Sequence, residues 1–507
     1  MRIENSIRNI TTSLVGQFIN IALNFITRSI FIKILGTEYL GINGLFVNII
    51  SILTLAEMGI GSAIVYSLYR PIAEKNTYKI KGLMNFYNSA YKLIAIIILI
   101  LGICIIPGIP YIVSSDIGNA KIITIYVLFL INAVSSYLYA YKRSIIIADQ
   151  KDYILSIYRN IFKIILNIVQ VIILIISKNY IMFLLIQISI TLLENIIVAK
   201  KANRMYPLLL ERDDTKLDVV ERKEIIKNVK ALLYHKIGGV IVNSTDNILI
   251  SIFVGISYVG LYSNYYLIIG ALNMLIGPAF SALTASVGNL NVLETKEKSY
   301  KTYKLLLFIN FWIAGFCSIC LLVLFNPFIS VWLGKEYLFN NYIVIAIVVN
   351  FYMLTIRRAT LVYKDSFGLF WNDRYKPLIE SVINIIISGI LAPKLGIVGV
   401  FIGTFSSTLL APFWIEPYVL YKYGFELPLK EFFKLFIKYT TIILIIAIIT
   451  VFSCSFITEF SFINLILKII ICLLIPNIIF VIFFYKQSEF KDMTKIIKQI
   501  SNKFTKK

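Results

Sequence analysis

Charged residues are scarce in this 507-residue sequence, at 15% of the chain against roughly 25% in soluble globular domains. Hydrophobic residues make up 59%, and the mean hydropathy is +0.83. A soluble core cannot absorb so much apolar surface without leaving wide exposed patches. The sequence therefore excludes a soluble enzyme, a secreted disulfide scaffold and a protein with one membrane anchor. It indicates a chain that crosses the bilayer many times.

Residues that carry most enzyme chemistry are also rare. The single histidine, His235, lies at the predicted cytoplasmic edge of a helix, so an O-acyltransferase, which needs an intramembrane histidine, is a minor alternative. The five cysteines lie in apolar stretches and are expected to pack as small core residues. The sequence has no G-x-x-x-x-G-K-[ST] loop, which argues against direct ATP hydrolysis. We expect no enzyme activity, no metal site and no cofactor.

Apolar runs of about 18 residues or more, which are long enough to cross a bilayer as helices, are bounded by charged or turn residues. They predict an all-α integral membrane protein with about fourteen transmembrane helices. The expected helices are 7–33, 39–68, 84–107, 119–142, 154–177, 180–200, 232–254, 258–287, 303–326, 341–363, 377–393, 397–420, 434–456 and 461–485.

The net charge of +22 is spread over many loops rather than gathered in one patch, so it does not indicate nucleic-acid binding. With a cytoplasmic N-terminus, 41 of the 49 Lys and Arg residues fall on the cytoplasmic side and 5 in the outer connections. Because basic loops stay inside, we expect both termini in the cytoplasm. The basic tail after Tyr485 is expected to lie on the anionic inner leaflet.

A short repeat relates the two halves of the chain. Residues 36–42 and 255–261 both read G-x-x-Y-[LV]-G-[IL], 219 residues and six expected helices apart. An even number of helices preserves the orientation, which predicts two six-helix lobes related as parallel repeats; coincidence between two similar turns is the alternative. We expect an N-terminal lobe at 1–200, a cytoplasmic linker at 201–231, a C-terminal lobe at 232–420, and two extra helices with a basic tail at 421–507.

Polar residues recur on single faces of several expected helices. A charge at the bilayer centre costs about 2.5–3.5 kcal/mol on insertion scales, so the charges that remain there normally face a cavity. These faces predict a hydrated cavity for an anionic polar group. The expected binding residues are Gln17, Asn20, Asn24, Arg28, Glu57, Lys163, Asn167, Glu194, Asn243, Asp246 and Asn247.

Structural roles are the alternatives for these residues. Asn and Gln side chains often hydrogen-bond between packed transmembrane helices. Lys163 could instead extend its amine to the inner membrane surface. Arg28 and Asp246 could pair with each other.

Several stretches carry a resemblance to a known family. The G-x-x-Y-x-G segment at 36–41 is followed by LAEMGIGSAI at 55–64 and SLY at 67–69. A later stretch reads FGLFWNDRYKP at 367–377 and continues through Glu380, Asn384 and Ser388 to GIVGVFIGT at 396–404. Together they resemble the Wzx-type polysaccharide repeat-unit flippases over most of the chain. The resemblance implies the multidrug/oligosaccharidyl-lipid/polysaccharide (MOP) exporter superfamily, in which twelve or fourteen helices in two MATE-like lobes move cargo by alternating access.

The resemblance implies a flippase in the inner membrane of a bacterial cell. It would move an undecaprenyl-pyrophosphate-linked oligosaccharide outward for O-antigen (lipopolysaccharide) or capsule biosynthesis, with membrane lipid, H⁺ or Na⁺, a glycan polymerase and glycosyltransferases as partners. The guanidinium of Arg28 suits a pyrophosphate, because its fork matches phosphate oxygens. The alternatives are a lipid II flippase and an ion-coupled multidrug exporter of the same superfamily; Glu57, Glu194 and Asp246 would suit the exporter.

Overall fold

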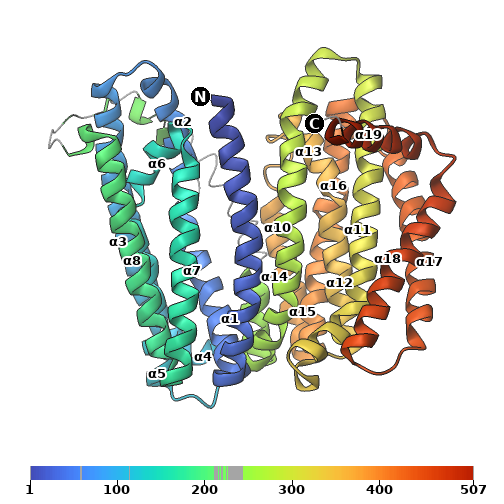
Figure 1. Cartoon of the computed structure of the whole chain (residues 1–507), viewed down its shortest axis with the longest axis horizontal. Helices are drawn as coiled ribbons and strands as arrows, with labels where there is room; N and C mark the ends of the chain where they lie inside the picture. Colours follow the sequence, from blue (N-terminus) through green and yellow to red (C-terminus); the bar gives the residue numbers. More distant parts are fainter. Residues whose placement is uncertain are drawn as a thin grey trace. The chain divides into compact units, whose positions relative to one another are not determined.

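The computed structural model describes residues 2–57, 60–113, 115–210, 215, 217–218, 221–223, 225–226 and 244–505. Regular structure in these ranges is helical throughout, and none of them contains a strand (Figure 1). Within the described residues, twelve helical segments are long and apolar enough to cross a membrane. The prediction of an all-α, multi-pass membrane protein is confirmed.

Twelve segments rather than fourteen are found for two reasons. α1 (Arg2–Leu53) joins the first predicted helix to the start of the second, so that Gly16–Leu53 forms one candidate span. The predicted helix 232–254 lies partly outside the described residues, and its described part, 244–253, is helical.

The chain divides into two compact units, Met1–Ser263 and Asn264–Lys507. The first unit contains α1 (Arg2–Leu53), η1 (Thr54–Glu57), α2 (Ile60–Ala73), α3 (Thr77–Ile105), η2 (Ile106–Gly108), α4 (Ile109–Ile112), α5 (Asn119–Tyr137), α6 (Tyr141–Ala148), α7 (Asp152–Ser177), α8 (Tyr180–Met205) and η3 (Pro207–Leu209). After α10 (Ile256–Leu293), the second unit contains α11 (Lys296–Trp332), η4 (Lys335–Tyr337), α12 (Asn341–Ile356), α13 (Arg358–Ser366), α14 (Lys376–Leu395), α15 (Ile397–Leu410), α16 (Pro412–Val419), η5 (Leu420–Phe425), α17 (Lys430–Ser455), α18 (Phe462–Phe484) and α19 (Ser488–Thr505). The predicted lobe and linker boundaries near 200 and 231 stay a prediction.

The second predicted helix, 39–68, is interrupted in the structure. α1 ends at Leu53, a 3₁₀ turn follows as far as Glu57, and α2 begins at Ile60. Non-helical backbone at membrane depth is tolerated only where protein covers it or where it lines an aqueous cavity.

In this unit α7 packs between α1 and α8, and α5 packs against α3 and α8.

The two copies of the repeat meet inside the first unit. Gly36 and Gly255 occupy equivalent repeat positions, and both have positive φ, +84° and +119°, which glycine adopts at little cost. A Cβ atom added to Gly41 would overlap the carbonyl oxygen of Ile256, and one added to Gly260 would overlap that of Thr37. Because Thr37 and Ile256 are also equivalent, the contact is reciprocal, as expected for segments related by a two-fold axis.

This crossing predicts a strong effect of one methyl group. We expect Gly41→Ala to lower the melting temperature of the purified protein and its abundance in membranes, because the new Cβ forces two backbones apart, at about 1–3 kcal/mol. Gly44→Ala is the matched control one turn further along α1, where the added Cβ would lie 3.5 Å from Val259. That change should be neutral or stabilising, since alanine favours helices over glycine. Equal stability of the two variants would contradict the close crossing.

The second unit is organised around α11, which packs against α12, α17, α18 and α19. Its core is rich in buried aromatic rings, among them Tyr303, Phe308, Tyr363, Tyr421, Phe425, Tyr439 and Phe484. α14 and α15 form a tight pair, because Cβ atoms added to Gly399 and Gly403 would overlap Leu391 and Ser388 of α14. Small residues permit such close approach of transmembrane helices, which gives these glycines of the 396–404 stretch a packing role.

Candidate functional site

One face of α1 carries the first predicted polar stripe. Gln17, Asn20, Asn24 and Arg28 are all partly buried and lie before the kink at Gly36. Within the described ranges, the Oε1 atom of Gln17 is buried without a hydrogen-bond partner. An unsatisfied buried acceptor costs roughly 1–3 kcal/mol, so a bound group that donates a hydrogen bond would stabilise this face.

Arg28 is held by a hydroxyl group. Its Nη1 donates to Ser263 Oγ at 2.7 Å, and that hydroxyl donates to the carbonyl of Gly260 at 2.7 Å. The buried ring of Tyr180 lies near enough to interact electrostatically with the guanidinium. In the part of the chain that the structure describes, no carboxylate forms an ion pair with Arg28. A guanidinium has five N–H donors, so the others can meet an anion.

The predicted binding residue Asn167 on α7 contacts α1. The hydroxyl of Thr27 donates to Asn167 Oδ1 at 2.6 Å, and Asn167 Nδ2 donates to the carbonyl of Lys163 at 2.7 Å. A Cβ atom added to Gly16 would overlap the side chain of Asn160. Asn167 therefore joins α1 and α7, which is the structural role given above as the alternative to binding. A role in binding stays a prediction for Asn167, and also for Lys163, which is partly exposed.

Two of the predicted acidic residues, Glu57 and Glu194, have polar partners in the first unit. Glu57 accepts a hydrogen bond of 2.7 Å from the hydroxyl of Tyr137. Glu194 accepts one of 2.9 Å from Arg143, whose Nη2 also donates to Asn195 at 2.6 Å. From the sequence, Arg143 is expected only as a loop cation. The neutralised Glu194 is poorly suited to attract a cationic drug.

Three predicted residues fall around the partly described seventh helix. Asn243 lies outside the described residues, as does His235. Asp246 and Asn247 lie on the helical stretch 244–253, and Asp246 has a polar interaction partner. The Oδ1 atom of Asn247 is buried, without a hydrogen-bond partner among the residues described. Because Arg28 forms no ion pair with any described carboxylate, its pairing with Asp246 is not present in this structure.

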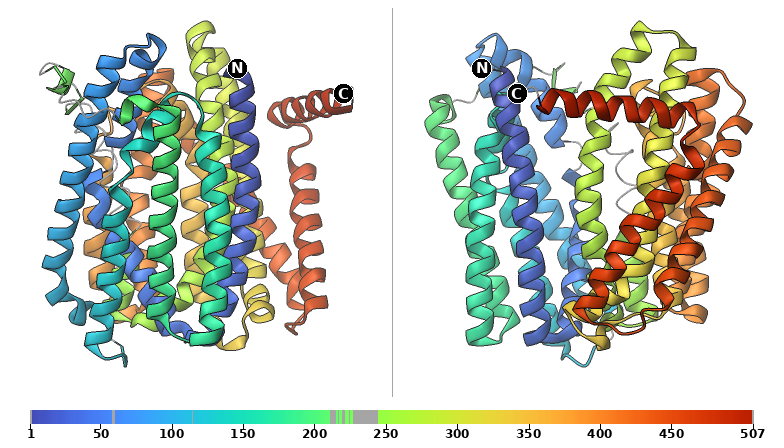
Figure 2. Two further views of the ribbon diagram at one scale, coloured as in Figure 1. Left: turned by 60° about the vertical axis from the view of Figure 1, so that its left-hand side comes forward. Right: turned by 45° about the vertical axis from the view of Figure 1, so that its right-hand side comes forward.

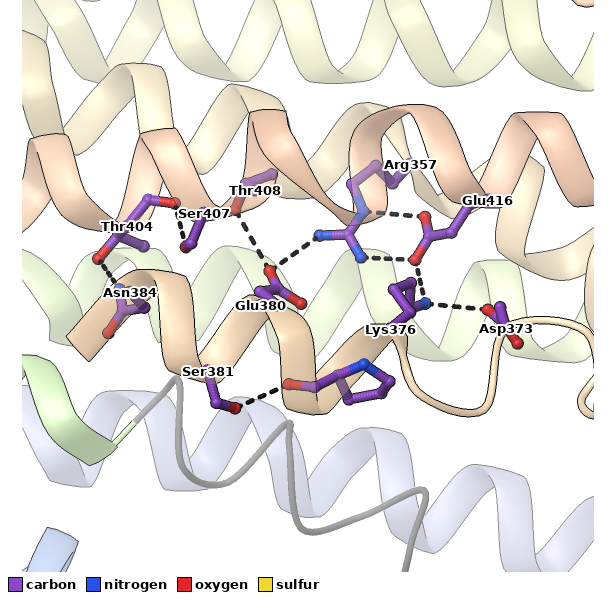
Figure 3. A network of polar contacts seen from close by, with 11 residues as sticks. Arg357, Asp373, Lys376, Glu380, Ser381, Asn384, Thr404, Ser407, Thr408 and Glu416 are labelled. Atoms are coloured by element: carbon purple, nitrogen blue, oxygen red, sulfur yellow. Dashed lines mark hydrogen bonds and ion pairs between the residues drawn. The ribbon is translucent and has the colours of Figure 1, made fainter. Parts of the chain in front are cut away.

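The second unit contains a buried network of charges that the sequence prediction missed (Figure 3). Its centre is Glu416 on α16, whose side chain is fully buried. Arg357 donates two hydrogen bonds to this carboxylate, from Nε to Oε2 at 2.9 Å and from Nη2 to Oε1 at 2.6 Å. The ammonium of Lys376 donates a further hydrogen bond to the same Oε1. Bidentate pairing of this kind is strong and directional.

The network extends in two directions from Glu416. Lys376 lies 3.2 Å from Asp373, which also accepts a hydrogen bond of 2.7 Å from Lys364. On the other side, Arg357 lies 3.9 Å from Glu380. Three cations thus face three carboxylates, and the buried charge is balanced.

A polar strip continues between α14 and α15. The hydroxyl of Thr408 donates to Glu380 at 3.4 Å, and Asn384 Nδ2 donates to Thr404 Oγ1 at 3.0 Å (Figure 3). The charge network and this strip hold α13, α14, α15 and α16 together. One signal was present in the sequence, because Glu380 and Glu416 lie inside predicted apolar helices where an acid is costly unless paired. No group of three or more His, Cys, Asp or Glu residues in the described ranges is arranged to hold a metal ion.

Comparisons with known proteins found similar solved structures but no similar sequence. No family model matches the sequence, and no curated protein matches it. The solved structure of the lipid II flippase MurJ in an inward closed conformation aligns with a TM-score of 0.62 and 17% identity, over 95% of this chain and 99% of the flippase.

Multidrug exporters share the fold as well. An inward-facing multidrug resistance MATE family transporter of the MOP superfamily aligns with a TM-score of 0.61 and 15% identity, over 82% of this chain and 99% of its own. The MATE multidrug transporter DinF-BH, solved in complex with a ligand, gives 0.58 and 16%, over 84% and 96%. At such low identities the likeness shows the fold, and this chain has the fold of MOP-superfamily transporters.

Proposed function

We propose that this protein is a flippase that moves an undecaprenyl-pyrophosphate-linked oligosaccharide from the cytoplasmic to the outer face of a bacterial cell membrane, for surface polysaccharide synthesis. One observation carries the proposal. Arg28 lies on the partly buried polar face of α1 and forms no ion pair within the described ranges, in a fold shared with a lipid II flippase. A permanent cation in that position suits a pyrophosphate.

The polar face of α1 offers hydrogen-bonding groups that a sugar needs when it crosses the hydrocarbon of the bilayer. Moving a hydroxyl group from water into hydrocarbon without a hydrogen-bond partner costs about 4–8 kcal/mol on alkane scales. Gln17, Asn20 and Asn24 offer amide donors and acceptors that can replace hydration as the sugars pass, while the polyprenyl tail remains in lipid. The unsatisfied Oε1 of Gln17 is one such acceptor.

Two features favour a lipid-linked anionic cargo over a cationic drug. Glu194 is already neutralised by Arg143, and Glu57 is engaged by Tyr137. The likeness to the lipid II flippase also extends over 95% of the chain, further than that to the exporters, at 82–84%. Lipid II itself is the nearest rival cargo. Since the sequence lacks a nucleotide-binding loop, we propose that an H⁺ or Na⁺ gradient supplies the energy.

Reconstitution of the full chain tests this function. Liposomes without ATP are loaded with an undecaprenyl-pyrophosphate oligosaccharide that carries a fluorophore on the sugar, and an impermeant reductant added outside reports the fraction that has crossed. We expect transfer under an imposed ion gradient, faster than transfer of lipid II with the same fluorophore. Faster movement of lipid II would identify the rival flippase, uptake of a cationic rhodamine dye without lipid transfer would identify an exporter, and a strict need for ATP would contradict the energy source.

A further inference from the structure

The chain turns sharply after its last candidate span. α18 ends at Phe484, and α19 begins at Ser488 after three residues. Figure 2 shows α19 running across the end of α18 rather than alongside it. Three residues span about 10 Å at most, so α19 is confined to the level at which α18 leaves the bilayer.

One face of α19 is fixed to the body of the second unit. Glu489 lies 3.9 Å from Lys304, and Asp492 lies 3.8 Å from Lys301, both on α11. The ring of Phe490 stacks on Trp312, with 5.9 Å between the ring centroids and 16° between the planes. Met493 packs beside it against the aromatic core. These contacts use both acidic residues of α19.

The opposite face of α19 is basic. Lys491, Lys495 and Lys498 are exposed and are spaced four and three residues apart, which places them on one face. At 100° per residue this face points away from Glu489 and Met493, and Asp492 lies at its edge. Asp492 also lies 3.8 Å from Lys495, an exposed pair of the kind that contributes little. Among the described residues, Lys491 and Lys498 form no ion pair with the acids of α19.

We infer that this basic face binds the acidic headgroups of the surrounding phospholipid bilayer, independently of the cargo. The short connection to α18 keeps α19 at the membrane surface, and its docking on α11 fixes the lysine face. α11 changes at this level from a stretch with four lysines, at 296, 298, 301 and 304, to the apolar run that follows, which marks the boundary between water and lipid. Near an anionic surface each lysine contributes about fivefold to binding, so Lys491 and Lys498 together contribute on the order of 25-fold. Lys495 adds less than a full share, because Asp492 lies 3.8 Å away.

A fluorophore next to the lysines tests this surface in the full-length protein. Gln499 is exposed one turn after Lys495, and Gln499→Cys carries bimane in nanodiscs of phosphatidylcholine and phosphatidylglycerol, with either lipid brominated as the quencher. We expect brominated phosphatidylglycerol to quench about fivefold more strongly or better at low salt. The preference should fall at high salt, since the Debye length shrinks to about 3 Å at 1 M.

Matched variants separate charge from folding. Replacing the three lysines with glutamine should abolish the preference, whereas replacing them with arginine should retain it; all three side chains are exposed, so neither change removes core packing. The parent chain without Gln499→Cys gives the background from native cysteines. Equal quenching by the two lipids, a preference that survives the glutamine variant, or no quenching by either lipid would each overturn the inference, and the last would indicate a soluble partner.

Discussion

Replacing Arg28 with alanine should abolish export of the lipid-linked glycan while the amount of protein in the membrane stays near normal. The guanidinium is held by a hydrogen bond to Ser263, so its removal disturbs little hydrophobic packing. Losing a charge-assisted hydrogen bond to pyrophosphate costs about 1.5–3 kcal/mol, which corresponds to a loss of roughly 10- to 100-fold in transfer rate. The liposome assay measures this rate, and immunoblotting of membranes measures abundance.

Two further variants sharpen the result. Arg28→Lys should retain partial transfer, because the charge remains while the bidentate fork is lost. Arg70→Ala is the matched control, since Arg70 is an exposed arginine of the same unit, paired with Glu74. It should transfer at the normal rate. Near-normal transfer by Arg28→Ala would remove Arg28 from the proposed cargo site.

The structural alternative makes a different prediction. If Arg28 pairs with Asp246, Arg28→Ala lowers abundance, and the exchange of the two residues, Arg28→Asp with Asp246→Arg, restores it. Under the cargo hypothesis Arg28→Ala is already near normal in abundance, and the exchange does not restore transfer, because the cation has moved to another helix. Abundance and transfer rate together therefore distinguish the two accounts.

Apolar runs predicted most of the described spans, and helical periodicity predicted their polar faces. Neither predicted that the first two helices are joined in α1 or that α1 ends at Leu53. The spacing of Gln17, Asn20, Asn24 and Arg28 places them on one face of α1, and the polar face of α7 lies against α1 through Thr27 and Asn167. Periodicity could not show whether such a face lines a cavity or a helix contact, because both require the same spacing. Asn167 illustrates the second case.

Sequence patterns could not predict the charge network in the second unit. Arg357 and Glu416 are 59 residues apart, and nothing in either local sequence shows that their helices are neighbours. Arg357, Lys364 and Lys376 lie near predicted helix ends, so sorting by topology assigned them to a cytoplasmic loop. In the structure all three cations form ion pairs with buried carboxylates.

Glu416→Ala should be among the most destabilising single changes in the second unit. Removing this buried carboxylate leaves Arg357 without its bidentate partner and Lys376 with Asp373 alone nearby, 3.2 Å away. Breaking a buried ion pair by removing one partner costs about 3–5 kcal/mol. We expect a melting temperature several degrees lower for the purified protein, together with low abundance in membranes.

Glu426→Ala is the matched control for this change. Glu426 also pairs with a lysine of the second unit, Lys296, but the two side chains are 69% and 56% exposed, and exposed pairs contribute about 0–1 kcal/mol. A charge-balanced variant, Arg357→Met with Glu416→Met, removes one charge of each sign and should be more stable than Glu416→Ala, because no uncompensated charge stays buried. If Glu416→Ala melts like Glu426→Ala, water reaches these charges and the network does not hold the four helices together.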